Sequence, residues 1–408
     1  MKKISLMALA LVSAASMSAQ VTLVKEAEKA FKGADTYPAF QEAVTLITPA
    51  FTNDETKSDA KTFWIPGKQA FKIYDDMLVN KQLGKQVSDL DMSLVLLDGL
   101  NYGFKALDVD TVIDAKGKVK TKLSKEITSL IGGHHSDFVS AGSVIWDQQK
   151  YPEAYQAFTA YATLPGNPRL GSSAPKALAD TMAAQIDYYR GLAAWQANML
   201  PEAAQAFEDM MALGYDDISA YDYAYSVAYQ LNDPEKMLKY SQIAYDKWGA
   251  QKPEFLQRII QYYINAKDYN TALGILKDAI AKNPNDANFY YLYGVLTDDQ
   301  GNKEEAMNYF KKAVELGPDN AMVNFSYGTA ILQKWEKMAD EAANLSTPEY
   351  NKLRVETMDP MLKEAASYLE KAYSLDEDNM RNALTNLKII YYNLNDGENL
   401  KRVETLLL

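Results

Sequence analysis

A pattern of three residues recurs along the chain and restricts the folds that it can adopt. A small residue is followed twelve places later by alanine, and four places after that by a large apolar residue. The clear copies are Gly142/Ala154/Phe158, Gly191/Ala203/Phe207 and Gly294/Ala306/Phe310. Weaker copies begin at Tyr225 and Ile260, and Gly328 is a further start, so the starts from Gly191 onward lie 34, 35, 34 and 34 residues apart. A fixed period of this length indicates stacked copies of one supersecondary unit.

The period and the residue types resemble the tetratricopeptide repeat (TPR) family, whose unit is a helix–turn–helix of 34 residues. Two antiparallel helices approach closely only where side chains are small, which suits Gly294 opposite Ala306. Phe310 is expected to fill the space where the next hairpin stacks. Pro284 and Pro318 close second helices, because proline cannot continue a helix. The resemblance implies an all-α fold, an α-solenoid of antiparallel helix pairs (a TPR-like superhelix) with about seven to eight hairpins, two of them elongated.

The quality of the match divides the chain into parts. Residues 132–333 form the predicted TPR array, with surplus residues in a Pro- and Gly-rich loop around positions 165–175. Residues 20–131 match poorly and are predicted to be divergent N-terminal helical hairpins. Residues 334–364 carry their own helical apolar spacing and are predicted to be an elongated hairpin insertion. Residues 365–408 are predicted to be the final repeat helix and a C-terminal capping hairpin.

The start of the chain is typical of an export signal. Two lysines precede an apolar run of about a dozen residues, which ends in small residues at Ala19. Residues 1–19 are therefore predicted to be a secretory signal peptide that is cut before Gln20. The chain has no cysteine, which excludes lipid attachment through an N-terminal Cys. We expect the mature chain in the periplasm or associated with the outer membrane, with release from the cell as the alternative.

Composition excludes several classes of function. The chain has 42 basic and 54 acidic residues, a net charge of −12, which disfavours nucleic acid as the main partner. With no Cys and two His, disulfides, thiolate metal sites and sites with several histidines are excluded. No Gly-rich phosphate loop, Gly-x-Ser-x-Gly or His-Glu-x-x-His motif occurs, so the sequence predicts a non-enzymatic protein without a cofactor or metal. Carboxylates that folding brings together are invisible in a sequence, which leaves glycoside hydrolysis open.

Three clusters of polar residues could carry chemistry. His134 and His135 are neighbours that point about 100° apart on a helix, so they do not chelate one ion and are predicted to be structural. They follow two glycines that we expect at a helix start. Asp108, Asp110 and Asp114 lack the ligand and the glycine that an EF-hand places between such aspartates. A basic cluster is predicted to lie in an exposed loop or small hairpin, with a docking patch for an anionic partner as the alternative: Lys116, Lys118, Lys120, Lys122 and Lys125.

The candidate binding surface follows from the resemblance, which implies that first helices line a concave groove that holds a ligand. The matching positions carry Tyr and Trp beside Asn and Gln, which supply contact area and partners for a peptide backbone. They are Tyr188, Leu192, Trp195, Gln196, Asp222, Ser226, Tyr229, Gln230, Gln257, Gln261, Asn265, Tyr291, Val295, Asp298 and Asp299. Packing between hairpins is the alternative role for each aromatic residue. The Lys and Asn pairs with which some TPR proteins clamp a carboxylate are absent from these positions.

These features favour a non-catalytic scaffold of the bacterial cell envelope that binds another protein or a peptide segment in its groove. One alternative is a glycan-binding accessory protein of an outer-membrane uptake system. Another is a structural envelope component that self-associates through the elongated hairpin 334–364.

Overall fold

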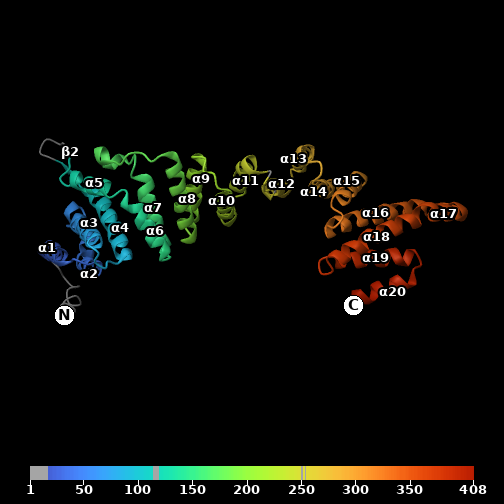
Figure 1. The fold of residues 1–408 in the computed structure, drawn as a ribbon, viewed down its shortest axis with the longest axis horizontal. Helices are drawn as coiled ribbons and strands as arrows, with labels where there is room; N and C mark the ends of the chain where they lie inside the picture. The colour runs from blue at the N-terminus through green and yellow to red at the C-terminus, as the bar shows by residue number, and fades with distance from the viewer. Residues whose placement is uncertain (1–16, 114–118, 250, 253) are drawn as a thin grey trace. The chain divides into compact units, whose positions relative to one another are not determined.

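The computed structural model describes residues 17–113, 119–249, 251–252 and 254–408, and helices make up nearly all of this part (Figure 1). The chain divides into two units, one that ends at Trp248 and one that begins at Gly249. In each unit consecutive helices pair as hairpins, which confirms the predicted all-α solenoid. Positions 1–16 of the predicted signal peptide lie outside the described residues.

The N-terminal unit begins with eight elements that the repeat pattern fits poorly. Helices α3 and α4 form its main hairpin, in which a Cβ atom on Gly67 would lie 3.2 Å from the backbone nitrogen of Gly103. Two short strands follow and pair antiparallel, as expected for the basic cluster, of which Lys116 and Lys118 are outside the described residues. The elements are α1 (Met17–Gly33), α2 (Tyr37–Ile47), η1 (Thr48–Phe51), α3 (Ala60–Gln82), α4 (Asp89–Val109), β1 (Val112–Ile113), β2 (Val119–Lys120) and α5 (Ser124–Gly133).

Three regular hairpins complete this unit. The surplus loop before the second of them contains a 3-10 turn whose Leu170 is buried, so this segment packs onto the helices rather than projecting into solvent. Asp233 accepts a hydrogen bond from the backbone N–H of Lys236 (3.0 Å), which caps α11 as its position before Pro234 predicts. The elements are α6 (Asp137–Asp147), α7 (Tyr151–Thr163), η2 (Pro168–Ser173), α8 (Asp180–Gln196), α9 (Leu200–Ala212), α10 (Ile218–Gln230) and α11 (Pro234–Trp248).

The C-terminal unit contains two regular hairpins, the elongated hairpin and a last short one. Helices α16 and α18 are the long arms of the elongated hairpin and lie side by side (Figure 1). Ser346 and Glu349 cap the helix between them reciprocally, as their spacing predicts. The elements are α12 (Glu254–Asn265), α13 (Tyr269–Lys282), α14 (Ala287–Asp299), α15 (Lys303–Leu316), α16 (Ala321–Ala342), α17 (Thr347–Leu353), the π-helical turn η3 (Arg354–Met358), α18 (Asp359–Leu375), α19 (Arg381–Asn393) and α20 (Gly397–Leu407).

A glycine packed against a large side chain holds each of four hairpins together. A Cβ atom on Gly294 would lie 2.7 Å from the ring of Phe310 on the paired helix, closer than real Cβ contacts come. Gly142 and Gly191 face the rings of the phenylalanines sixteen places later in the same way, and Gly328 faces Leu369. The Phe310 ring therefore fills the space that its own hairpin's glycine leaves, and it also belongs to one buried apolar cluster with Val323 and Tyr327 of the next hairpin.

The turn between paired helices is also the same in six hairpins. One residue in each turn has a positive φ, between 53° and 85°. At Asn198 this closes a Schellman motif, in which the backbone N–H of Met199 donates to the carbonyl of Ala194 (2.8 Å). The six residues are Gln149, Asn198, Asn232, Lys267, Gly301 and Asn395. Each of the first five lies seven residues after the start of a copy of the three-residue pattern. The turn therefore occurs at a constant position within the repeat.

Substitution of two helical glycines separates the packing requirement from helix propensity. We expect Gly294→Ala to destabilise the C-terminal unit by about 1–3 kcal/mol, because the added methyl group overlaps the Phe310 ring. Gly274→Ala is the matched control. It should stabilise by up to about 1 kcal/mol, since a Cβ there meets nothing within 4 Å. Urea unfolding followed by circular dichroism measures both, and equal effects of the two substitutions would contradict the packing argument.

Candidate functional site

The first helices α8 and α10 carry half of the predicted binding residues on one face. Tyr188, Leu192 and Trp195 follow i, i+4, i+7 spacing, which forms one stripe on α8. Ile186, Arg190 and Ala193 lie on the side of α8 turned away from this stripe and are buried. The stripe that contains Trp195 is half-buried.

A buried charge cluster fixes α8 against α9 more firmly. The guanidinium of Arg190 pairs with Asp187 (2.9 Å) and with Asp209 of α9 (2.5 Å), and the first two residues are each 7% exposed. Burial raises the pKa of Asp187 to about 6, while the positive charge of Arg190 opposes this rise. These contacts set the orientation of the side chains on the other face of α8.

Aromatic and amide side chains connect α8 to α10. The indole N–H of Trp195 donates to the side-chain oxygen of Gln230 (3.3 Å). The ring of Tyr223 lies between Trp195 and Tyr188 of α8, with centroid distances of 5.6 Å and 6.4 Å respectively. Burial raises the pKa of Tyr188 to about 12, so its hydroxyl is neutral near pH 7. Sequence reasoning missed Tyr223, although it lies directly after Asp222.

We call this surface the aromatic face and define it by the predicted residues of α8 and α10 together with Tyr223. None of its members is fully buried. Tyr229 is 67% exposed, and Gln196 and Gln230 are also exposed. Ser226 donates to the carbonyl of Asp222 in its own helix (2.9 Å). The remaining members are half-buried: Tyr188, Leu192, Trp195, Asp222 and Tyr223.

The other predicted residues belong to the C-terminal unit. On α12, Gln257, Gln261 and Asn265 are exposed, and the amide of Gln261 donates to the side-chain oxygen of Asn265 (2.8 Å). On α14, Tyr291 is half-buried against Phe310, with ring centroids 6.1 Å apart.

Burial raises the pKa of Tyr291, while a hydrogen bond with Ser326 opposes the rise. Val295 beside it on α14 is also half-buried. Asp298 forms an ion pair with Lys303 (2.8 Å), which balances its charge, and Asp299 is exposed. All members of the predicted set are thus exposed or half-buried, and in the N-terminal unit Trp195 of α8 contacts Gln230 of α10.

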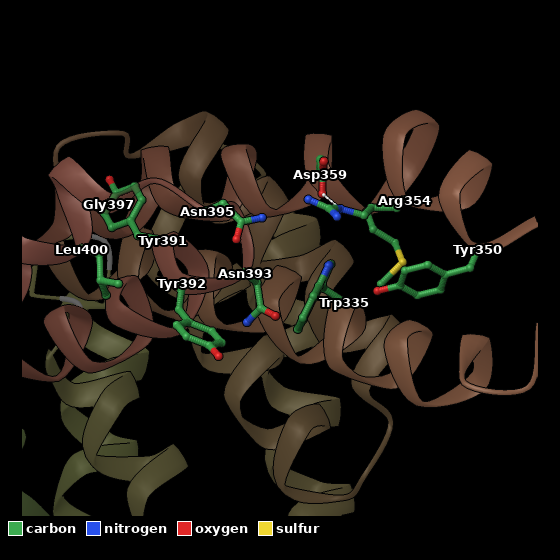
Figure 2. Close-up of a pocket in the computed structure, with 11 residues that line it drawn as sticks. Trp335, Tyr350, Arg354, Asp359, Tyr391, Tyr392, Asn393, Asn395, Gly397 and Leu400 are labelled. Atoms are coloured by element: carbon green, nitrogen blue, oxygen red, sulfur yellow. Dashed lines mark hydrogen bonds and ion pairs between the residues drawn. The ribbon is translucent and has the colours of Figure 1, made fainter. Parts of the chain in front are cut away.

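A cleft of about 480 Å³ in the C-terminal unit was not predicted from the sequence (Figure 2). We call it the hairpin cleft, because the elongated hairpin and the turn between α19 and α20 enclose it. Four aromatic residues, two asparagines and an ion pair line it. Its lining residues are Trp335, Tyr350, Arg354, Met358, Asp359, Tyr391, Tyr392, Asn393, Asn395, Gly397 and Leu400.

The two histidines have structural contacts. His134 Nδ1 lies 2.9 Å from the carboxylate of Asp137, and its ring stacks on Phe71 (5.0 Å). His135 Nε2 lies 2.8 Å from the backbone oxygen of Tyr161, on whose ring it stacks. The two glycines before them end α5 rather than begin a helix, contrary to expectation. In the described part of the chain, no group of three or more His, Cys, Asp or Glu residues is arranged to hold a metal ion.

Asp110 serves as a long-range cap for α5. Its carboxylate accepts hydrogen bonds from the backbone N–H groups of Lys122, Leu123 and Ser124 and from the Ser124 hydroxyl, at 2.7–3.1 Å. Burial by itself would raise the pKa of Asp110, but these hydrogen bonds outweigh it and lower the pKa. Asp108 instead forms an ion pair with Arg169 (2.6 Å). Asp108 and Asp110 therefore have structural partners, and Asp114 lies outside the described residues.

The fold and these surfaces define a helical repeat scaffold with exposed aromatic and amide side chains. The family profile described as tetratricopeptide repeat matches residues 141–372, so the chain belongs to the TPR family, whose members typically act as protein-interaction scaffolds. No curated protein matches the chain. Across the described residues, no helix is both long enough and apolar enough to cross a bilayer.

Several solved structures match parts of the chain at low identity and with low TM-scores. YrrB, described as a TPR protein with an unusual peptide-binding site, is 20% identical over 46% of this chain and 88% of its own, with a TM-score of 0.30. MamA from Desulfovibrio magneticus RS-1 is 16% identical over 47% of this chain and 97% of its own, with a TM-score of 0.33. The C-terminal part of a TPR protein from Cytophaga hutchinsonii is 16% identical over 66% and 99%, with a TM-score of 0.34.

The capping role of Asp110 predicts a pH-dependent loss of stability. Asp110→Asn should destabilise the N-terminal unit by about 1–3 kcal/mol at pH 7, because a charged acceptor of several hydrogen bonds is lost. The folded pKa lies below the ordinary value of 3.8, so the contribution is present above that pH and is lost as the pH falls through the folded pKa.

Urea unfolding at neutral and acidic pH measures this difference. The exposed Asp216→Asn in the same unit is the control and should have no effect. If the loss of unfolding free energy caused by Asp110→Asn stays constant down to about pH 2, the capping role of the Asp110 carboxylate is contradicted.

Proposed function

We propose that the chain is a non-catalytic scaffold that binds an extended peptide segment of another protein across its aromatic face. The observation that supports this is the row formed by Tyr188, Tyr223 and Trp195, with the exposed Tyr229 further along α10. Aromatic side chains with few rotatable bonds give contact area at a low entropy cost. The row runs across two neighbouring first helices, so a ligand that follows it contacts two repeats at once.

Amide groups beside the rings suit a peptide backbone. Gln196 and Gln230 are exposed at the edge of the row, and each side chain offers a donor and an acceptor. Asp222 adds one negative charge to a surface that is otherwise neutral. An extended peptide exposes N–H and C=O groups in alternation, and these amides can pair with both. We therefore expect a partner segment that is extended and rich in apolar or aromatic residues, with few acidic ones.

We propose further that this scaffold acts in the bacterial cell envelope, in the periplasm or at the outer membrane. The support is the sequence of residues 1–19, with its two lysines, apolar run and small residues before Gln20. The partner would then be another envelope protein.

Substitution on the aromatic face tests the binding role. Trp195→Ala and Tyr229→Ala should each reduce capture of a partner by about tenfold or more, because each removes a central or exposed aromatic contact. Photo-crosslinking in the native envelope, from benzoylphenylalanine placed at position 229, should give a discrete polypeptide adduct, and mass spectrometry identifies it. Binding of a synthetic peptide from that partner is then measured by calorimetry.

The control is Tyr392→Ala in the other unit, which removes a tyrosine of nearly equal exposure (70% against 67%). Circular dichroism must show unchanged helicity in all three variants. If Trp195→Ala and Tyr229→Ala bind the peptide as tightly as the unaltered chain, the aromatic face is not the binding surface.

Export can be tested on the protein itself. We expect the chain recovered from a fractionated Gram-negative host to begin at Gln20 and to be released with the periplasmic or envelope fraction. N-terminal sequencing provides the measurement. Replacing the apolar run with polar residues should retain the chain in the cytoplasm with Met1 or Lys2 at its start. Recovery of the uncut chain from the cytoplasm without this change would contradict the proposed location.

A further inference from the structure

The hairpin cleft is built from segments that lie far apart in the sequence (Figure 2). Trp335 comes from α16, Tyr350 from α17 and Arg354 from the π-helical turn. The opposite wall comes from the end of α19 and the turn after it, which contribute Tyr392 and Asn395. All these residues belong to the C-terminal unit, so the cleft is independent of the aromatic face.

The π-helical turn is the first sign that the cleft has a role beyond packing. Such turns insert one residue into a helix, are unfavourable in isolation and occur frequently at functional sites. Here the backbone N–H of Asp359 donates to the carbonyl of Arg354, five residues earlier. The turn places Arg354 and Met358 on the wall of the cleft.

Trp335 provides a second sign. Its indole Nε1 is buried and has no hydrogen-bond partner among the described residues. A buried donor without an acceptor costs about 1–3 kcal/mol, so most such groups in folded proteins are satisfied. In Figure 2 this nitrogen points toward the side of the cleft where Arg354 and Asp359 lie. Because Nε1 is buried in this structure, a ligand oxygen would supply the missing acceptor only after a small rotation of the Trp335 ring toward the cleft.

The aromatic rings around the cleft are open to a ligand. Within the described residues, none of the rings of Trp335, Tyr350, Tyr391 and Tyr392 stacks on another ring. Tyr392 is 70% exposed and Tyr350 is 36% exposed. Tyr391 is buried and donates its hydroxyl to Glu370 (2.7 Å), which fixes its position. The exposed rings can therefore each receive the flat face of a ligand.

The polar groups of the cleft are balanced in charge. Arg354 Nε lies 3.3 Å from the carboxylate of Asp359, so a cation and an anion stand side by side. Asn393 donates to the carbonyl of Ile389 (2.8 Å), which leaves its side-chain oxygen as an acceptor. Asn395 brings a second amide. The cleft therefore offers donors and acceptors in close alternation and no net charge.

We propose that the hairpin cleft binds a neutral carbohydrate of one or two pyranose rings. Each sugar hydroxyl both donates and accepts, which matches the paired Arg354 and Asp359 and the two asparagine amides. The C–H face of a pyranose ring is apolar and flat, which matches the exposed Tyr350 and Tyr392. An anion is disfavoured by the carboxylate beside Arg354, and a purely apolar ligand would leave Trp335 Nε1 unsatisfied. A volume of about 480 Å³ lies in the range of small-ligand pockets.

The test is binding of named saccharides to the full mature chain. Saturation-transfer NMR and calorimetry are carried out with cellobiose, maltose, xylobiose and chitobiose as neutral ligands. Digalacturonic acid and the tripeptide Gly-Tyr-Gly are the charged and peptide comparisons. We expect at least one neutral disaccharide to bind with a Kd between about 10 μM and 5 mM.

Three variants assign the binding to the cleft. Tyr392→Ala should weaken it by about tenfold or more through loss of the exposed ring, and Trp335→Phe should weaken it severalfold while keeping an aromatic ring in place. Tyr229→Ala, on the other unit and nearly equally exposed, should leave it unchanged. Thermal unfolding of each variant confirms that it is folded.

Three results would overturn the proposal. The first is that no neutral disaccharide of the panel binds at concentrations up to about 10 mM. The second is that sugar binding survives Tyr392→Ala at full strength. The third is that the tripeptide or the acidic sugar binds at the cleft in place of the neutral ones. Tyr229→Ala tests peptide binding at the aromatic face, and Tyr392→Ala tests sugar binding at the hairpin cleft. Either proposal can therefore fail while the other stands.

Discussion

The close approach of two helices at a glycine is the contact on which three of the five regular hairpins depend. The rings of Phe158, Phe207 and Phe310 occupy the space that the opposing glycine leaves vacant, and any Cβ there would overlap the ring. This contact fixes the rotation of the first helix about its axis. The recurring turn with a positive φ, seven residues after the glycine, then fixes where the second helix starts. Together they decide which side chains are buried and which remain available to partners.

The aromatic face is one consequence of that fixed rotation. Gly191 and Arg190 hold α8 against α9, and Trp195 is half-buried on α8, where it meets Tyr223 and Gln230 of the next repeat. Its rings contact one another in an open row, which suits an extended chain. The hairpin cleft uses similar residue types differently. Its rings do not stack on one another in the described structure, and with Arg354 and Asp359 they surround a confined volume suited to a compact ligand.

Prediction from the sequence succeeded where contacts are local. Gly294 and Phe310 are sixteen residues apart, and the contact between Asp233 and the start of α11 spans three residues, so a repeated spacing reveals both. The same approach did not show that the Phe310 ring also lies against the glycine of its own hairpin, because a pattern identifies a small residue and a large one without showing which neighbours the ring contacts. It also missed Tyr223, whose ring joins the row through residues one repeat away. The sequence spacing argued against Asp110 as an EF-hand ligand but assigned it no role, which became visible only when folding placed its carboxylate beside the backbone of Ser124.

The sequence by itself determined the repeat period, the helix pairs, their turns and caps, and the family, because each depends on interactions within about one repeat of 34 residues. Only the tertiary structure decided what the elongated hairpin encloses. Trp335, Arg354 and Tyr392 belong to three different elements, and no spacing rule connects them. Their meeting depends on how α16, the π-helical turn and the end of α19 pack together, which is a property of side-chain volumes across the whole unit rather than of any single segment.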